Sequence, residues 1–173
     1  MNDRIKQIAL SFVGRQEIPG NLGFKDDRFE ELMVDVGWKK GQAWCSYFAE
    51  LVWKLAFKEL HPELLSVIDN LFSAGAVATY NKFKDSNFVV DKKPEIGSVA
   101  IWQTWKNNQP HWSGHAGIVV GICGGNEIIT VEGNTNASGG REGIEVAQKR
   151  RKLSFDAKTG LVLKGFLHPT LKI

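Results

Sequence analysis

Three residues far apart in the chain carry the side chains that thiol catalysis requires. Cys45 stands at the predicted start of a helix, where unpaired backbone N–H groups and the positive end of the helix dipole favour a thiolate. His115 opens a predicted strand, and Glu132 ends the strand that follows it. Taken singly, Cys45 is more often a small core side chain and His115 a structural or solvated histidine, and the plain interpretation of Glu132 is a solvated strand-end carboxylate. Together they match the pattern of a nucleophile, a base and an orienting acid in thiol catalysis.

A predicted hairpin brings His115 and Glu132 together. The two strands are separated by Cys123-Gly124-Gly125, a segment typical of a turn. If Gly121 pairs with Asn126, the antiparallel register places His115 directly opposite Glu132, with Cβ atoms roughly 4.5–5.5 Å apart. A slip of one residue would break this arrangement. In this geometry Glu132 fixes the imidazole tautomer, and His115 takes the thiol proton and later donates a proton to the leaving amine.

Further polar and aromatic groups are expected around the nucleophile. The backbone N–H of Cys45 is one candidate donor for the developing oxyanion, and the Gln42 side chain is a second. Asn134, two positions beyond Glu132, continues on the same face if the strand does. Tryptophans that follow the first predicted strand could stack on sugar or peptide. The residues expected to contact substrate are Gln42, Trp44, Trp105 and Trp112.

Length and composition fit one domain of 173 residues with an apolar content, 43%, that is sufficient for a core. The 22 Lys and Arg residues against 19 Asp and Glu residues give a net charge of +3, which excludes a strong field for nucleic acid. The basic run Lys149–Lys152 is more typical of a solvated strand edge. Two cysteines are too few for a disulfide framework, although one bridge is formally possible in an oxidising compartment. No apolar window is long enough to span a bilayer.

The elements that position these residues follow from periodicity. Helical spacing predicts helices over Ile5–Val13, Phe29–Val36, Trp44–Leu60 and Glu63–Lys84, the last with a break at Gly75. Alternating β-branched and aromatic residues predict strands over Val99–Gln103, Ala116–Ile122, Glu127–Glu132, Ile144–Lys149 and Leu161–Leu167. The order predicts an α+β fold, with N-terminal helices packed on a roughly five-stranded antiparallel sheet. We predict Thr104–Gly114 to be a long polar and aromatic loop at the rim of a binding site.

Four segments together resemble the CHAP domains (cysteine, histidine-dependent amidohydrolases/peptidases) of bacterial and phage peptidoglycan hydrolases, over roughly residues 42–152. They are Trp44-Cys45-Ser46-Tyr47-Phe48-Ala49, Pro94–Trp102, Gly114–Val120 and Val131–Asn136. The resemblance implies a papain-like fold in a single catalytic domain, residues 1–173. It also implies Cys45 as nucleophile, His115 as base, Glu132 as orienting acid and Asn134 as a further polar group. The implied substrate is peptidoglycan, cleaved by an N-acetylmuramoyl-L-alanine amidase or by an endopeptidase.

The chain departs from the family pattern at two positions. Many relatives carry Gln directly before the cysteine and Asp after the glycine that enters the strand, whereas this chain has Trp44 and Ser98. The side chain of the oxyanion hole therefore stays open. We expect no cofactor and no metal, because the acidic residues between 26 and 31 lack the glycine-punctuated pattern of a calcium loop. Zinc at His111 and His115 is disfavoured by the strand character around them.

Two expectations concern partners and location. The N-terminus does not resemble a secretory signal, so action at the cell wall, in the periplasm or outside the cell, implies delivery by lysis, a phage or a secretion machine, or a leader already removed. We expect a monomer that neither binds nucleic acid nor inserts into a membrane. The alternative function is a non-catalytic cell-wall-binding or interaction module, in which aromatic residues bind and the cysteine is inert.

Overall fold

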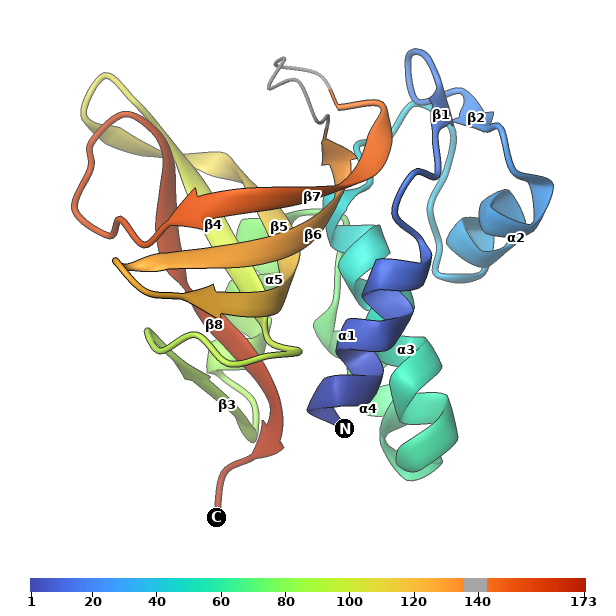
Figure 1. Cartoon of the computed structure of the whole chain (residues 1–173), viewed down its shortest axis with the longest axis horizontal. Coiled ribbons are helices and arrows are strands. Elements are labelled where there is room, and N and C mark those ends of the chain that lie inside the picture. Colours follow the sequence, from blue (N-terminus) through green and yellow to red (C-terminus); the bar gives the residue numbers. More distant parts are fainter. Residues whose placement is uncertain (136–142) are drawn as a thin grey trace.

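The structure, a computed structural model, describes residues 1–135 and 143–173. Within these residues it contains five α-helices, a six-stranded antiparallel sheet and a separate two-stranded sheet (Figure 1). The helices precede the large sheet in the chain and lie beside it, which confirms the predicted α+β class. The large sheet has one strand more than the predicted five, because the short segment Phe88–Asp91 adds an edge strand.

The predicted helices are confirmed, with small differences at their ends. They are α1 (Asn2–Ser11), α2 (Asp27–Asp35), α3 (Cys45–Leu60), α4 (Leu65–Leu71) and α5 (Ala76–Lys84), with a 3₁₀ turn at Pro62–Leu64. The predicted break at Gly75 is the N-cap of α5. The α2 helix starts where the Asp26 carboxylate accepts a hydrogen bond from the Phe29 N–H at 2.7 Å, a common N-cap.

The strands form two sheets. The small sheet pairs β1 (Glu17–Ile18) with β2 (Gly23–Phe24), and sequence periodicity did not predict it. The large sheet contains β3 (Phe88–Asp91), β4 (Val99–Lys106), β5 (Gln109–Cys123), β6 (Glu127–Thr135), β7 (Glu145–Lys152) and β8 (Gly160–Leu171). Its strand order is β3-β8-β4-β5-β6-β7. The strands β5 and β6, which hold the candidate histidine and glutamate, therefore lie side by side near the β7 edge.

The predicted loop over Thr104–Gly114 is wrong. This segment continues β4 and begins β5, and the two strands are joined by a tight turn at Asn107 and Asn108. Both asparagines have positive φ angles, 52° and 61°, the conformation that a two-residue hairpin turn of the right twist requires. Asparagine adopts this left-handed conformation more readily than most residues, so an Asn-Asn pair can form the turn without glycine.

The predicted register of the next hairpin is also wrong. Gly121 pairs with Ile129 rather than with Asn126, and Ile118 pairs with Val131. The turn consists of residues 124–126, and a bulge between Val119 and Gly121 changes the register within β5. Near His115 the partner strand is displaced by two residues from the predicted alignment, and a displacement of two keeps every side chain on its predicted face.

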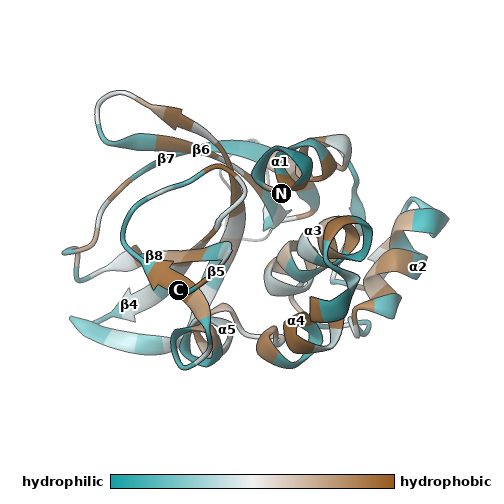
Figure 2. Ribbon diagram, turned by 90° about the horizontal axis from the view of Figure 1, so that it is seen from below, coloured by the Kyte–Doolittle hydropathy of each residue, from teal (hydrophilic) through white to brown (hydrophobic). Residues whose placement is uncertain are grey.

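The helix α3 lies between the large sheet and the other N-terminal helices. It packs against β5 and β6 on one side and against α1 and α4 on the other. Its Trp53 is fully buried, and the indole N–H donates to the carbonyl of Gly97 at 3.1 Å. Hydrophobic residues of α1 and α3 lie where these helices gather beside the sheet (Figure 2). This packing fixes the N-terminal end of α3 against the middle of the sheet.

Candidate active site

The Cys45 side chain lies at the first residue of α3 and is 7% exposed. The preceding residue, Trp44, anchors this helix end. Its ring is fully buried and packs edge-on against Phe24 and Phe48, and its N–H donates to a carboxylate oxygen of Glu17 at 2.5 Å. The bulky indole thus fixes the start of α3, so the thiol is held at the helix N-terminus.

His115 and Glu132 are hydrogen-bonded as expected, although not through the predicted register. The His115 Nε2 atom lies 2.8 Å from Glu132 Oε2, and the two side chains are 12% and 0% exposed. The Glu132 side chain passes over Gly117, where an added Cβ would lie 2.7 Å from Glu132 Cγ. Because Nε2 is bound to Glu132, Nδ1 is the ring nitrogen left to interact with the Cys45 sulfur.

The Glu132 carboxylate has three further hydrogen bonds. Thr130 donates from its hydroxyl to Oε1 at 2.6 Å. Arg151 donates from Nε to Oε1 at 2.8 Å and from Nη2 to Oε2 at 2.6 Å, a bidentate ion pair. With His115 included, this buried carboxylate accepts four hydrogen bonds, which compensates for its complete removal from water.

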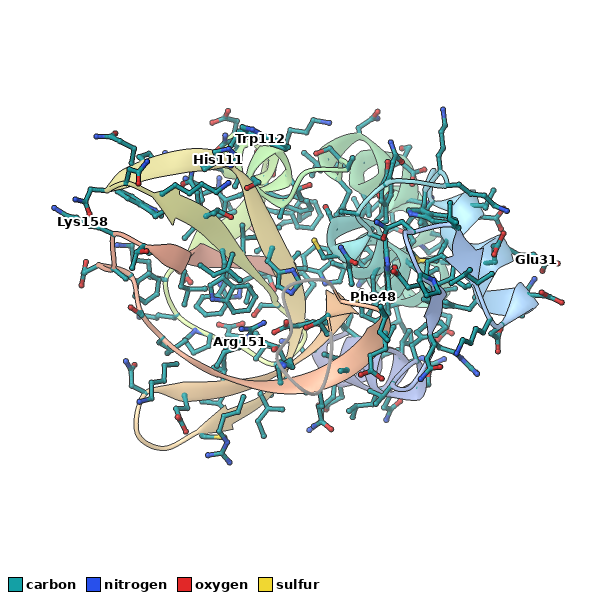
Figure 3. The ribbon with its side chains drawn as sticks, turned by 90° about the horizontal axis from the view of Figure 1, so that it is seen from above. Glu31, Phe48, His111, Trp112, Arg151 and Lys158 are labelled. Atoms are coloured by element: carbon teal, nitrogen blue, oxygen red, sulfur yellow. The ribbon has the colours of Figure 1, made fainter. Side chains whose placement is uncertain are left out.

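Arg151 was missed by the sequence reasoning, which interpreted Lys149–Lys152 as a solvated edge. The interpretation holds for Arg150 and Lys152, which are exposed, but Lys149 and Arg151 are partly buried. Residues alternate between the two faces of a strand, and this alternation within the basic run is the signal that could have placed Arg151 on the side of the site. In Figure 3, Arg151 lies near the middle of the view, among the strands of the sheet.

Cys45, His115 and Glu132 stabilise one another's charged forms. Burial disfavours the Cys45 thiolate, but the His115 cation, hydrogen bonding with that ring, and the backbone N–H groups of Ala116 and Ser46 outweigh burial and lower the pKa of Cys45. Burial likewise opposes the imidazolium, but Glu132 and Cys45 raise the pKa of His115 to about 10. Despite burial, Arg151 and His115 hold the pKa of Glu132 well below its usual range. The lowered Cys45 pKa and the raised His115 pKa both favour a thiolate–imidazolium pair.

A cleft of about 790 Å³ opens beside this cluster. Cys45, His115 and Asn134 line it, together with Trp105, so these predicted residues are brought together. Asn134 lies near the end of β6 with a positive φ of 51°. Lining residues also come from β1 with the turn that follows it and from β7, two parts of the chain that the sequence did not associate with the site. They are Glu17, Gly20, Asn21, Lys149 and Arg151.

Three of the four residues predicted to bind substrate are not among the residues that line this cleft. Trp44 is fully buried in the core and has no surface with which to contact a ligand. The Gln42 side-chain oxygen accepts from the Tyr47 hydroxyl at 3.0 Å and the Lys39 N–H at 3.1 Å, so it fixes the loop before α3. Trp112 is 78% exposed and lies with His111 at the periphery (Figure 3). The burial of Trp44 corrects the expectation that this residue contacts substrate, whereas substrate contact by Gln42 and Trp112 stays a prediction.

Two other sequence-based questions concern metals and membranes. In residues 1–135 and 143–173, no group of three or more His, Cys, Asp or Glu side chains is placed to hold a metal ion. Of the acidic residues considered for calcium, Asp26 caps α2, and Glu30 accepts the Phe24 N–H at 2.7 Å. Over the same described residues, every helix is too short or too polar to traverse a lipid bilayer.

Comparison with known proteins identifies the family. The CHAP domain profile matches residues 37–134, more than half of the chain, and this range includes Cys45, His115, Glu132 and Asn134. The chain therefore belongs to the CHAP domain family, as the sequence motifs indicated. CHAP domains are amidase or peptidase hydrolases that act on cell-wall peptidoglycan, which makes peptidoglycan hydrolysis the general activity indicated for this chain. No curated protein and no solved structure matches the chain.

Proposed function

We propose that the protein is a cysteine hydrolase that cleaves an amide bond of peptidoglycan with Cys45 as nucleophile. One observation carries the proposal: a thiol at a helix N-terminus, an imidazole and a buried, fully hydrogen-bonded carboxylate lie together beside an open cleft. The alternative of an inert binding module does not explain why three ionisable groups are buried in mutual contact. Burying charged groups costs desolvation free energy, and a binding module with an inert cysteine has no need of them.

In the first half of the reaction, the Cys45 thiolate attacks the carbonyl carbon of the amide. The carbonyl electron pair moves to oxygen, and the resulting oxyanion lies near the N-terminus of α3, where the Cys45 N–H and the helix dipole stabilise negative charge. When the tetrahedral intermediate collapses, the C–N bond breaks and the His115 imidazolium transfers its proton to the leaving amine. The products of this half are a free amine and a thioester on Cys45.

In the second half, water attacks the thioester. His115, now neutral, accepts a proton from the water while its Nε2–H stays directed at Glu132. Collapse of the second tetrahedral intermediate releases a carboxylic acid and restores the thiolate–imidazolium pair. Glu132 remains ionised throughout, because the hydrogen bonds from Arg151 and the charge of His115 hold the pKa of Glu132 low.

We propose Asn134 as a further polar group at the reacting carbonyl and Trp105 as a stacking surface for the glycan or the peptide. Both line the cleft. The bond cleaved is either the N-acetylmuramoyl-L-alanine amide or an amide within the stem peptide and its cross-bridge, since the same thiol chemistry acts on each. Either activity places the working protein at the bacterial cell wall, in the periplasm or outside the cell.

Mass analysis of products from purified peptidoglycan tests the proposal. Release of intact peptides together with free lactyl groups on muramic acid identifies an amidase, and new amino termini within the peptides identify an endopeptidase. Peptidoglycan that binds the protein but yields no new amine or carboxyl group contradicts the proposal and favours the binding module.

A further inference from the structure

The thiol mechanism explains why a carboxylate holds His115 but not why a guanidinium holds that carboxylate. We propose that Arg151 is a positioning residue that divides the charge of Glu132 between itself and His115, and thereby sets how readily His115 gives up its proton. The inference rests on the proposed function, because it assigns His115 a proton to donate. Arg151 lies beyond the residues matched by the family profile, which end at 134.

The hydrogen-bond geometry carries this inference. The same oxygen, Glu132 Oε2, lies 2.8 Å from His115 Nε2 and 2.6 Å from Arg151 Nη2. The other oxygen is occupied by Arg151 Nε at 2.8 Å and by the Thr130 hydroxyl at 2.6 Å. The imidazolium and the guanidinium therefore compete for one oxygen atom of one carboxylate.

This competition matters for the proton transfer. A buried carboxylate that interacted with His115 alone would stabilise the imidazolium fully and make it a weak acid toward the leaving amine. The arginine guanidinium does not lose its proton in proteins, so Arg151 always withdraws part of that stabilisation. The orientation of the Glu132 carboxylate toward His115 and the proton affinity of His115 then both depend on the Arg151 guanidinium.

A tryptophan fixes the positions of both competing groups. The Arg151 guanidinium carbon lies 5.4 Å from the centre of the Trp102 ring, and that ring lies 6.0 Å from the His115 ring, centre to centre. Trp102 is also the direct cross-strand partner of His115. The contact of the guanidinium with the Trp102 ring holds Arg151 in place beside Glu132 and favours a planar cation over the ammonium group of a lysine.

Other charged groups face the same cluster from several elements. Cys45 approaches from α3, and Glu17 lines the cleft from β1 while bound to the Trp44 indole. Lys149 lies on the Arg151 side of β7, and Lys106 lines the cleft from β4. Removal of the Arg151 charge leaves these groups in place, so the effect of Arg151 can be measured against a constant background.

The experiment follows the titration of the His115 ring by NMR in the full chain. Cys45 is replaced by alanine in every version, because the Cys45 thiolate itself raises the proton affinity of His115. Four versions are compared: the Arg151 parent, R151Q, R151M and R151K. R150Q is the matched control, since Arg150 is the neighbouring residue, pairs with Glu127 at 3.0 Å and is exposed. We expect R151Q and R151M to raise the His115 midpoint by about one pH unit, and R151K and R150Q to leave it near the parent value.

With Cys45 restored, R151Q is expected to lower kcat at least tenfold with little change in KM, and R151K is expected to recover part of this loss. An unchanged His115 midpoint in a folded R151Q or R151M variant overturns the inference, as does an equal shift in R151K. Failure of both neutral variants to fold while R151K folds also overturns it, since Arg151 would then act on stability alone. If the midpoint shifts as expected but no version cleaves peptidoglycan, the inference stands and the proposed function fails.

Discussion

Glu132 reaches His115 across the Cα of Gly117. The hydrogen bond between the two side chains is 2.8 Å long, and the Glu132 side chain occupies the space that a Cβ on residue 117 would fill. The missing side chain at residue 117 is therefore what lets a buried carboxylate lie alongside the strand that carries the histidine.

The substitution Gly117→Ala is expected to disrupt catalysis more than folding. The new Cβ would lie 2.7 Å from Glu132 Cγ, so the carboxylate must move and its bond to His115 lengthens. We expect kcat to fall by at least tenfold, on the scale of a lost orienting residue, with a melting temperature only a few degrees lower. The comparison is Gly124→Ala, because an added Cβ there meets nothing within 4 Å. Full activity of Gly117→Ala would show that the Glu132 position does not limit the reaction.

The pH dependence of thiol reactivity tests the proposed ion pair. Because the pKa of Cys45 is lowered, iodoacetamide is expected to modify Cys45 faster than Cys123 at neutral pH and below. Hydrolysis needs the protonated imidazole as well, so it is expected to decline as pH rises through the His115 pKa of about 10. Labelling is followed by peptide mass analysis, with urea-unfolded protein as the reference. Equal labelling of both thiols in the folded protein would count against activation of Cys45.

The same pair is expected to shape stability against pH. The Glu132 pKa is lowered from 4.5 in the folded protein. The contribution of Glu132 to the free energy of unfolding is therefore present above about pH 4.5 and is lost as pH falls. The His115 pKa is raised from 6.5 to about 10, so its contribution is complete below pH 6.5 and is lost as pH rises through 10. The stability loss from Glu132→Gln, about 3–5 kcal/mol by analogy with broken buried ion pairs, should be largest between pH 5 and 6. Urea unfolding across pH measures it, and a loss independent of pH would argue against the ion pair.

A buried acid away from the site offers a separate test. Glu50 on α3 is 6% exposed, and burial raises its pKa to about 7, with Lys54 opposing the shift. For a carboxyl group whose pKa is raised on folding, stability is complete below its unfolded value near 4.5 and declines as pH rises toward 7. Glu50→Gln is therefore expected to stabilise the protein by up to about 3 kcal/mol at pH 8 and to have little effect at pH 4. Thermal unfolding at the two pH values decides the matter, since a pH-independent difference would exclude ionisation of Glu50 as the cause.

The helices were predictable because each presents an apolar stripe at regular spacing, and α3 shows this most clearly in residues such as Phe48 and Val52. The turn at Asn107 and Asn108 was not recognised because it contains no glycine or proline. The β5–β6 register was predicted wrongly because β5 continues to Cys123 and the turn lies at residues 124–126, so Gly121 pairs with Ile129 and not with Asn126. The bulge between Val119 and Gly121 then reduces the displacement from three residues to two.

The candidate site was partly predictable for a different reason. Cys45, His115 and Glu132 could be associated because a displacement of two residues preserves the face of a strand, so an incorrect register still gave the correct neighbours. Arg151 reaches Glu132 diagonally from β7, where its cross-strand partner is Ile128. Such a long-range contact depends on side-chain length and on the curvature of the sheet, and sequence spacing does not encode either.

The central claim is that Cys45 forms the bond to the substrate, and digestion of purified peptidoglycan by matched variants tests it most directly. Cys45→Ala removes the nucleophile with little loss of volume, and Cys123→Ala removes the other thiol as a control. We predict that Cys45→Ala folds normally and releases no new amine or carboxyl groups, while Cys123→Ala digests the polymer at the wild-type rate. A folded Cys45→Ala variant that retains wild-type activity would contradict the account.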